Sequence, residues 1–558
     1  MKRVLILTLS LLMLLTSVGC VKPSGGDTPN NTEAPQATDE PVVTEAPAGE
    51  EYVITDAYLK EAKKAEGNAR VFYEIFVGSF SDSDGDGVGD LRGIINRMDY
   101  LNDGDPASGK SLGIDGIWLT PIFESPSYHK YDVTDYYKVD PAFGTEADLK
   151  ELIDLCHERG VYVILDLVIN HTGRKNEWYT KFREAHQQGD TQSEYYDFYT
   201  WYDADTQDPE AGHTYGQILG TQHFYECNFS GDMPELNFDN PLVIQAVTDV
   251  AEYYIDLGVD GFRFDAAKYV YYGDHQKSLE FWDSYLTVLR QKKPDLYTVA
   301  EVWDGDGITD IYYQATDCFD FYISQAEGLI AATAKKGDVN KLTSYIASYL
   351  NKIEGIREGA NIIPFISNHD MDRAAGYLTV ASGFMQMAAN LYILGPGSPF
   401  IYYGEELGMR GSRGGSNTDA NRRLRMRWDD GDTIADPTGA AYPEDNRVEV
   451  GAKGQLPDEH SLYNYYKKLI MARKANPEIY LGTYEPLKLS VNKVGGFRAE
   501  YNGSAVYVIH NTTGSTVTID LSELGLSAAV LRAVIGMEDA KIEGTSIVIG
   551  GQTSVIIK

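Results

Sequence analysis

The sequence predicts an α/β fold, a (β/α)₈ TIM barrel, with a domain inserted after the third strand and an all-β domain at the C-terminus. Four acidic residues each close or follow a β-branched, apolar run, the pattern of a buried parallel strand. They are Asp166, Asp265, Glu301 and Asp370. The 36 residues from Asp265 to Glu301 make about one βα unit, and the 69 from Glu301 to Asp370 make about two. Carboxylates at the ends of successive parallel strands meet on the top face of such a barrel.

The first barrel elements follow from local patterns. We expect a helix near Tyr58–Ala65 that leads into the first strand, Val71–Phe76. A second helix is predicted over Thr145–Arg159, because apolar residues recur on one of its faces and Gly160 can end it. The third strand starts directly after that glycine, which is the order of a βαβ unit.

The remaining organisation follows from spacing and from a change of pattern. From Asp166 to Asp265 there are 99 residues, one βα unit plus roughly 60 more, and we place an inserted segment at 172–238. After Ile479, short alternating runs separated by Gly and Asn predict strands. We therefore assign the barrel to 52–478 and a C-terminal β-sandwich domain to 479–558.

The net charge argues against some classes of binding partner, and the cysteine count argues against disulfides. The formal net charge is −35 over 558 residues, so nucleic acid and anionic membrane surfaces would repel the chain. After Cys20 only three isolated cysteines remain, Cys156, Cys227 and Cys318. This sparse, odd set argues against a disulfide framework.

The N-terminus has the pattern of a targeting segment. Lys2 and Arg3 precede a short apolar stretch, which predicts a signal peptide over residues 1–19. Cys20 follows Gly19 as at a bacterial lipoprotein cleavage site, and we expect it to carry lipid, although Ser17 stands where such sites usually have Leu. The alternative is a simply secreted protein.

The stretch that follows supports a membrane anchor. Residues 20–51 are rich in Pro and acidic residues and contain no aromatic residue, so they predict a solvated tether. We expect the protein to be anchored to the cell membrane only through this N-terminal lipid and to face outside the cytoplasm.

Seven segments, in order from about Val71 to Trp428, resemble the α-amylase family, glycoside hydrolase family 13. Four of them are DLVINH, GFRFDAAK, EVW and FISNHD, which contain the four acidic residues. The flanking segments are GIWLTP, MPELN and GSPFIYYGEE. The MPELN segment resembles that of a subgroup intermediate between oligo-1,6-glucosidases and neopullulanases.

The resemblance implies a retaining glycosidase in which Asp265 is the nucleophile, Glu301 the general acid/base and Asp370 the third catalytic carboxylate. The residue pattern agrees with these roles. Arg263 lies two residues before Asp265 on the same face of a strand, and its charge should keep Asp265 ionised. Apolar neighbours of Glu301 should raise its pKa, as a proton donor requires.

The resemblance also implies a set of substrate-binding residues. They are His129, Tyr131, Asp166, His171, Arg263, Lys268, His369, Asp419 and Arg423. Tyr131 matches the aromatic ring that stacks under the sugar, and Asp419 and Arg423 have the spacing of a family pair. Tyr269 departs from the pattern, because many α-amylases have His after the equivalent of Lys268.

A metal site is predicted from the segment DSDGDGVGD. Its carboxylates alternate with residues that allow tight turns, so a short loop can wrap a hard cation with oxygen ligands. The predicted ligands are Asp82, Asp84, Asp86, Val88 and Asp90. We expect structural Ca²⁺; the alternative is an acidic turn without an ion.

These observations predict endo-hydrolysis of α-1,4-glucosidic bonds in starch, maltodextrins and related α-glucans by a monomeric enzyme. One alternative is an exo-α-glucosidase or a neopullulanase or cyclomaltodextrinase. Another is a non-catalytic surface glycan-binding lipoprotein, against which the complete set of Asp265, Glu301 and Asp370 counts. Exo-acting relatives have a carboxylate three residues before the stacking tyrosine, where this chain has Tyr128.

Overall fold

The computed structural model describes residues 58–414 and 418–558. The chain divides into two units, 1–49 and 50–558, and all described residues belong to the second. The predicted signal peptide, Cys20 and the tether through residue 51 lie outside the described residues. Within the described part of the chain, no helix combines the length and the apolar character needed to cross a membrane.

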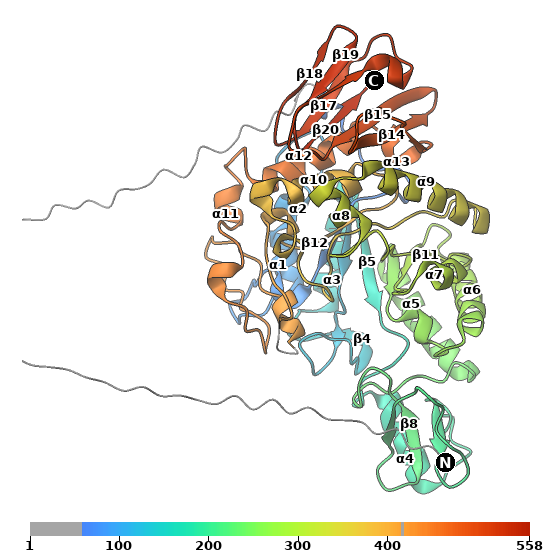
Figure 1. Ribbon diagram of the computed structural model, residues 1–558. Helices are drawn as coiled ribbons and strands as arrows, with labels where there is room; N and C mark the ends of the chain where they lie inside the picture. Colours follow the sequence, from blue (N-terminus) through green and yellow to red (C-terminus); the bar gives the residue numbers. More distant parts are fainter. Residues whose placement is uncertain (1–57, 415–417) are drawn as a thin grey trace, which may run out of the picture. The chain divides into compact units, whose positions relative to one another are not determined.

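A parallel sheet forms the centre of this unit (Figure 1). Its spatial order is β11-β10-β9-β5-β2-β1-β12, and each neighbouring pair runs parallel. The strands are β1 (Phe72–Ile75), β2 (Gly116–Leu119), β5 (Tyr162–Leu167), β9 (Gly261–Phe264), β10 (Tyr297–Ala300), β11 (Asp317–Cys318) and β12 (Phe400–Tyr402).

The eighth place in the barrel is filled by the segment around residues 363–365. Parallel bridges join Phe319 to Ile363 and Phe365 to Phe400, so this segment connects the β11 side of the sheet to β12. Because β12 also pairs with β1, the sheet closes on itself. The predicted barrel is therefore confirmed, with one strand reduced to isolated bridges.

Aromatic and aliphatic side chains fill the barrel interior. Phe72, Trp118, Phe319 and Phe400 come from different strands or strand ends and belong to one buried cluster. The rings of Phe72 and Phe400 stack with centroids 4.6 Å apart, across the β1–β12 closure. Layers of inward side chains are typical of TIM barrels, whose interior is a packed core and not a channel.

Helices alternate with the barrel strands along the chain. They are α1 (Leu91–Asn96), α2 (Met98–Leu101), α3 (Glu146–Arg159), α5 (Pro241–Leu257), α6 (His275–Lys292), α7 (Asp306–Tyr312), α8 (Leu329–Lys336), α9 (Val339–Ile356), α10 (Phe384–Ile393) and α12 (Leu462–Lys474).

The helix predicted at Thr145–Arg159 is confirmed as α3. Thr145 and Asp148 form a capping box at its start, and Gly160 ends it in the left-handed conformation at φ 77°. The helix predicted near Tyr58–Ala65 is wrong in length. Only a 3₁₀ turn, Leu59–Glu61, forms there.

The insertion after β5 forms a small α/β layer (Figure 1). Helix α4 (Glu177–Gln188) precedes an antiparallel sheet of β6 (Trp201–Asp203), β8 (His223–Glu226) and β7 (Tyr215–Gln217) in that spatial order. Isolated bridges join His171 to Glu235 and Tyr199 to Leu236, so the start and end of the insertion lie together.

Two antiparallel sheets form the C-terminal part. One has the order β13-β14-β15-β20-β17 and the other β16-β19-β18, and side chains of both share a buried cluster. Their bounds are β13 (Glu485–Pro486), β14 (Val494–Tyr501), β15 (Ser504–Asn511), β16 (Val517–Asp520), β17 (Leu531–Gly536), β18 (Ala540–Glu543), β19 (Ser546–Ile549) and β20 (Thr553–Ile557). The all-β character is as expected, whereas the domain boundaries stay predictions.

Asn390 of α10 connects the barrel layer to these sheets. Its Nδ2 donates to the Ile535 carbonyl oxygen and to Ser554 Oγ, both at 2.9 Å. Both groups are buried, so the pairing satisfies polar atoms that would otherwise cost free energy. Cys156, Cys227 and Cys318 are buried free thiols.

Candidate active site

A buried guanidinium organises the carboxylates at the strand ends. Arg263 of β9 is 1% exposed, and its Nη1 donates to Asp166 Oδ1 and to Asp265 Oδ1, each at 2.7 Å. Its Nη2 lies 3.0 Å from Glu301 Oε2. One positive charge therefore holds three of the four predicted carboxylates at a single point.

Strand register explains why these side chains meet. Asp166 of β5 pairs directly with Arg263 of β9 across the parallel ladder. Asp265 follows the last residue of β9, and Glu301 follows the last residue of β10. The carboxyl ends of adjacent parallel strands lie at one edge, so the sequence spacing becomes spatial proximity.

A residue in the left-handed backbone conformation gives Glu301 a further hydrogen bond. Ala266 has φ 50°, and its backbone N–H donates to Glu301 Oε2 at 3.0 Å. A non-glycine residue held in this region stores strain that the surrounding structure must compensate. Here the turn directs a main-chain donor at Glu301 immediately after Asp265.

Burial is the main influence on the pKa values of the three carboxyl groups around Arg263. Burial raises the pKa of Glu301, and the Arg263 guanidinium opposes that rise. Burial also raises the pKa of Asp265, again against Arg263, and it raises the pKa of Asp166 to about 7. The rise at Glu301 agrees with our expectation, whereas at Asp265 desolvation outweighs the arginine that we expected to prevail.

Asp370, unlike the three carboxyl groups around Arg263, has a pKa that its surroundings lower. Its Oδ1 lies 2.7 Å from Arg423 Nη2, and its Oδ2 lies 3.1 Å from His369 Nε2. Although burial opposes them, these two cations hold the pKa of Asp370 well below its usual range. This setting favours the ionised form of Asp370.

His369 is a buried cation. Burial lowers its pKa, but Asp370 on one ring nitrogen and Glu74 on the other raise it to about 10. The Nδ1 to Glu74 Oε1 distance is 2.6 Å. The Tyr131 hydroxyl lies 2.7 Å from His369 Nε2 and donates to Asp166 Oδ2 at 2.9 Å. Tyr131 thus joins the two charge clusters.

His129 is placed beside this cluster as a neutral ring. Its Nδ1 accepts the backbone N–H of Tyr131 at 3.1 Å, and burial lowers its pKa to about 4. Burial likewise lowers the pKa of His171 to about 4. Among the described residues, neither ring nitrogen of His171 has a hydrogen-bond partner.

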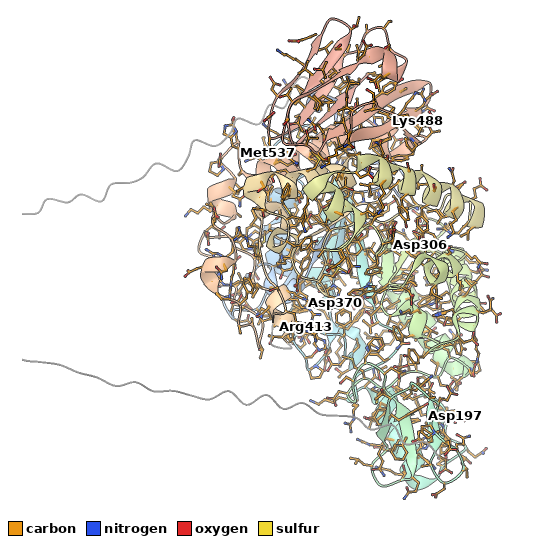
Figure 2. The ribbon with its side chains drawn as sticks, viewed as in Figure 1. Asp197, Asp306, Asp370, Arg413, Lys488 and Met537 are labelled. Atoms are coloured by element: carbon orange, nitrogen blue, oxygen red, sulfur yellow. The ribbon has the colours of Figure 1, made fainter. Side chains whose placement is uncertain are left out.

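A cavity of about 430 Å³ opens next to Glu301. Its lining includes Asp370 and the predicted binder Lys268, whose Nζ donates to the Trp303 carbonyl oxygen at 2.8 Å and to Asp304 at 2.9 Å. Figure 2 labels Asp370 within the barrel part, well apart from Asp197 in the inserted segment. The cavity therefore offers space for a sugar directly beside Glu301 and Asp370.

The predicted substrate-binding residues Asp419 and Arg423 have different ion-pair partners in the structure. Arg423 pairs with Asp370, and the Asp419 carboxylate lies 3.3 Å from Arg413 and 3.7 Å from Arg422. Arg422 ends the 3₁₀ turn Asp419–Arg422 and donates to the Asp370 carbonyl oxygen, whereas Arg423, the next residue, pairs with the Asp370 carboxylate.

Several site residues were missed by sequence reasoning. Glu74, which holds His369, is an acid inside the apolar strand β1, and that mismatch was the available signal. Tyr128 was considered only for its bearing on the mode of attack, and its contact with the site, a hydrogen bond accepted from Arg423 Nη1 at 3.2 Å, was not predicted. Phe229 lines the cavity from the insertion and had no distinguishing pattern in its surroundings.

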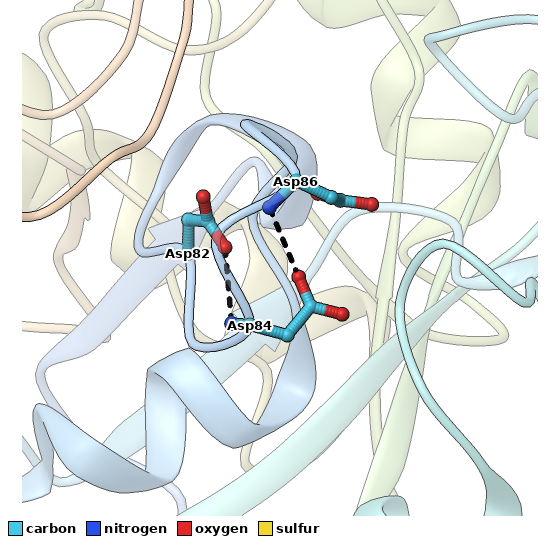
Figure 3. Close-up of side chains that lie close together, drawn as sticks. All are labelled: Asp82, Asp84 and Asp86. Atoms are coloured by element: carbon cyan, nitrogen blue, oxygen red, sulfur yellow. Dashed lines mark hydrogen bonds between the residues drawn. The ribbon is translucent and has the colours of Figure 1, made fainter.

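The predicted metal loop brings three carboxylates together (Figure 3). Ligand atoms of Asp82, Asp84 and Asp86 all lie within 4.8 Å of one another. Backbone N–H groups of Asp84 and Asp86 donate to the preceding aspartate of the series, at 3.1 and 3.2 Å. Gly85 and Gly87 have φ near 90°, which permits the tight winding of the loop.

The other two predicted ligands differ in position. Asp90 caps α1 by accepting the Gly93 N–H at 2.6 Å, and it also accepts from Ser83 at 2.8 Å, outside the group of three. Val88 donates its N–H to Asp86 at 2.7 Å. A distant segment also contributes, because the Thr433 hydroxyl donates to Asp82 at 2.6 Å.

Comparison with known proteins agrees with this geometry. The family described as "Alpha amylase, catalytic domain" matches residues 74–482. A curated relative, Alpha-amylase 3 of Dictyoglomus thermophilum, is 34% identical over 88% of this chain and 93% of its own length.

Two solved structures have the same fold over nearly their whole length. Amy13B of Eubacterium rectale has a TM-score of 0.81 and 33% identity, covering 89% of this chain and 96% of that one. The α-amylase from H. orenii has a TM-score of 0.77 and 33% identity, covering 88% and 99%.

The chain belongs to the α-amylase family of glycoside hydrolases. It is an α-glucan-acting enzyme of that family.

The buried His369 cation should make stability depend on pH. The unfolded ring titrates near 6.5 and the folded one near 10, so its stabilisation is complete below pH 6.5 and is lost as the pH rises through 10. We expect His369→Gln to lower the Tm most at pH 6 and progressively less up to pH 10. A Tm difference that stays constant across this range would contradict the linkage.

Proposed function

We propose that this protein is a retaining endo-hydrolase of α-1,4-glucosidic bonds in starch, maltodextrins and related α-glucans. The observation that carries the proposal is the contact of Asp265 and Glu301 with two nitrogens of one guanidinium. That arrangement favours the carboxyl separation of about 5–5.5 Å of retaining enzymes over the wider spacing of about 6.5–9.5 Å in inverting ones.

The two carboxyl groups have complementary roles in this mechanism. Glu301, whose pKa burial raises, gives its proton to the glycosidic oxygen as the bond to the leaving group breaks. Asp265 attacks the anomeric carbon and forms a glycosyl–enzyme ester. Glu301, now a carboxylate, then takes a proton from the water that opens the ester, which restores both groups.

The surrounding residues position the sugar. Anionic Asp370, held by His369 and Arg423, can accept hydrogen bonds from sugar hydroxyls. The ring of Tyr131 stacks on His369 at 5.5 Å and faces the same site. His129, His171 and Lys268 are the further binders that we propose from the family pattern.

The endo mode rests on the residue at position 128. Exo-acting relatives bind the chain end with a carboxylate there, whereas Tyr128 is an aromatic side chain that accepts a hydrogen bond from Arg423. An open binding site accommodates internal bonds of a polymer, as in the named α-amylases to which the chain is similar.

The catalytic roles can be tested by isosteric variants. Asp265→Asn and Glu301→Gln should each lower kcat by several orders of magnitude, because each group acts in the covalent transition states. Binding of maltooligosaccharide, measured by calorimetry, should persist in both variants. Retention of a tenth of the wild-type rate by Asp265→Asn would contradict its role as nucleophile.

Product analysis tests the mode of attack. We expect mixed maltooligosaccharides from amylose by chromatography, and the α-anomer first by NMR, since double displacement retains configuration. Glucose as the sole early product would instead indicate an exo-α-glucosidase. Early β-anomer would exclude the retaining mechanism.

We propose further that the Asp82 loop binds structural Ca²⁺. The donor set fits a hard cation, since three carboxylate ligand atoms converge and glycines let the chain wrap tightly. When bound, the cation would neutralise the clustered negative charge of these carboxylates. It would supply no catalytic step.

Metal removal gives the corresponding test. Chelation should lower the Tm, and added Ca²⁺ should restore it, because the ion binds the folded state. Asp84→Ala and Asp86→Ala should lose this response, whereas Asp105→Ala, an exposed aspartate of another loop, should keep it. An unchanged Tm of the wild type after chelation would leave no role for the loop as a metal site.

We also propose that Cys20 carries the lipid that anchors the enzyme outside the cytoplasm. The motif around Cys20 and the composition of residues 20–51 support this proposal, and monomeric action at the cell surface stays a prediction. Several acyl chains are needed for stable anchoring. Cys20→Ala should therefore move activity from the membrane fraction to the soluble fraction, and a wild type found only in the medium would contradict it.

A further inference from the structure

The wall of the cavity continues as a row of aromatic rings. Phe229 and Tyr269 line the cavity beside Glu301, and their ring centroids are 4.8 Å apart. Tyr272 stacks on Tyr269 at 5.2 Å with planes 7° apart. Phe229 and Tyr272 are 45% and 38% exposed, so part of each ring is open to contact with a ligand.

The row extends from the cavity onto the sheet of the insertion. Tyr272 meets the ring of His213 at 4.7 Å, and His213 lies parallel to Tyr215 at 6.2 Å. Tyr215 contacts Tyr202 at 4.7 Å, and Tyr202 stacks on Phe224 at 5.3 Å. We call this set the aromatic row: Phe229, Tyr269, Tyr272, His213, Tyr215, Tyr202 and Phe224.

In the β6–β8–β7 sheet, the aromatic row and the side chains that pack against α4 lie on opposite faces. Trp201 and Tyr225 pair across β6 and β8, and helix α4 covers them, with His186 4.5 Å from Trp201 and Tyr179 5.1 Å from Tyr225. Alternate residues point to the other face. That face carries the rings at the outer end of the row, and these rings stay partly exposed: Tyr202, Tyr215 and Phe224.

His213, in the middle of the aromatic row, is held in place by polar neighbours. His213 Nδ1 lies 2.5 Å from Glu226 Oε1, and Glu226 is only 5% exposed. Asn228 Nδ2 donates to the same oxygen at 2.6 Å. A ring fixed by such contacts loses little conformational entropy when a ligand stacks on it.

The role of Glu301 as general acid indicates which part of the substrate lies beside the aromatic row. A general acid must contact the glycosidic oxygen, so the leaving-group part of the substrate lies on the Glu301 side of the bond. Phe229, Tyr269 and Lys268 line the cavity beside Glu301, whereas Tyr131 contacts Asp166 and His369. The row therefore begins where the leaving-group chain emerges.

We propose that the aromatic row binds the leaving-group portion of a long α-glucan chain and carries it from the cavity onto the β6–β8–β7 sheet. This inference rests on the proposed function. Sugar rings present apolar C–H faces to aromatic rings and hydroxyls to solvent, which suits half-exposed tyrosines. The row gives the enzyme a preference for long chains over short oligosaccharides.

The test compares substrates of different length. Tyr272→Ala and Phe224→Leu should raise KM for amylose by about threefold to tenfold each, since one aromatic contact is worth roughly that factor. Because these rings lie away from the reacting bond, the effect should fall on KM and not on kcat. The rise in KM should be smaller for maltotriose, which cannot span the row.

Controls separate the possible outcomes. Tyr137→Ala removes a tyrosine that is 44% exposed and packs on Tyr253 outside the row, and it should leave both substrates unaffected. Phe224→Leu retains an apolar side chain, and Tm checks its fold. Equal effects on amylose and maltotriose, or a lowered Tm with unchanged KM, would show that the rings only pack on one another and would overturn the proposal. Wild-type enzyme inactive on amylose would instead contradict the proposed function.

Discussion

The buried guanidinium of Arg263 is the interaction on which the active site depends. Three carboxylates would otherwise lie together in the dry interior of the barrel mouth, where unpaired charge is expensive. Removing one member of a buried ion pair typically costs about 3–5 kcal/mol, because its partner stays buried without compensation. Arg263 therefore has a double role, since it allows the carboxylates to be buried and it fixes where they lie.

A second cationic pair gives the neighbouring carboxylate a different character. His369 and Arg423 keep Asp370 ionised, while desolvation raises the pKa of Glu301. Sites that separate the pKa values of nearby carboxyl groups can use one as an acid and another as a permanent anion. Tyr131 joins the two clusters through Asp166 and His369, so a substrate meets them as one surface.

Segments distant in sequence support this surface. Glu74 from the first barrel strand holds His369, and Thr433 reaches back to Asp82 in the loop after that strand. The insertion contributes Phe229 to the cavity and a sheet whose aromatic face continues from it. The chemistry thus lies in the barrel, while the insertion extends the surface available to the substrate.

The sequence by itself determined the barrel, the capped helix α3 and the four carboxylates, because strand runs, glycine stops and spacing are local signals. It could not determine which arginine pairs with the Asp370 carboxylate, since Arg422 and Arg423 are adjacent and only packing orients them. It also could not reveal Glu74 as the partner of His369, or the rise in the pKa of Asp265. These features arise from contacts between distant segments and from burial, which exist only once the barrel has closed.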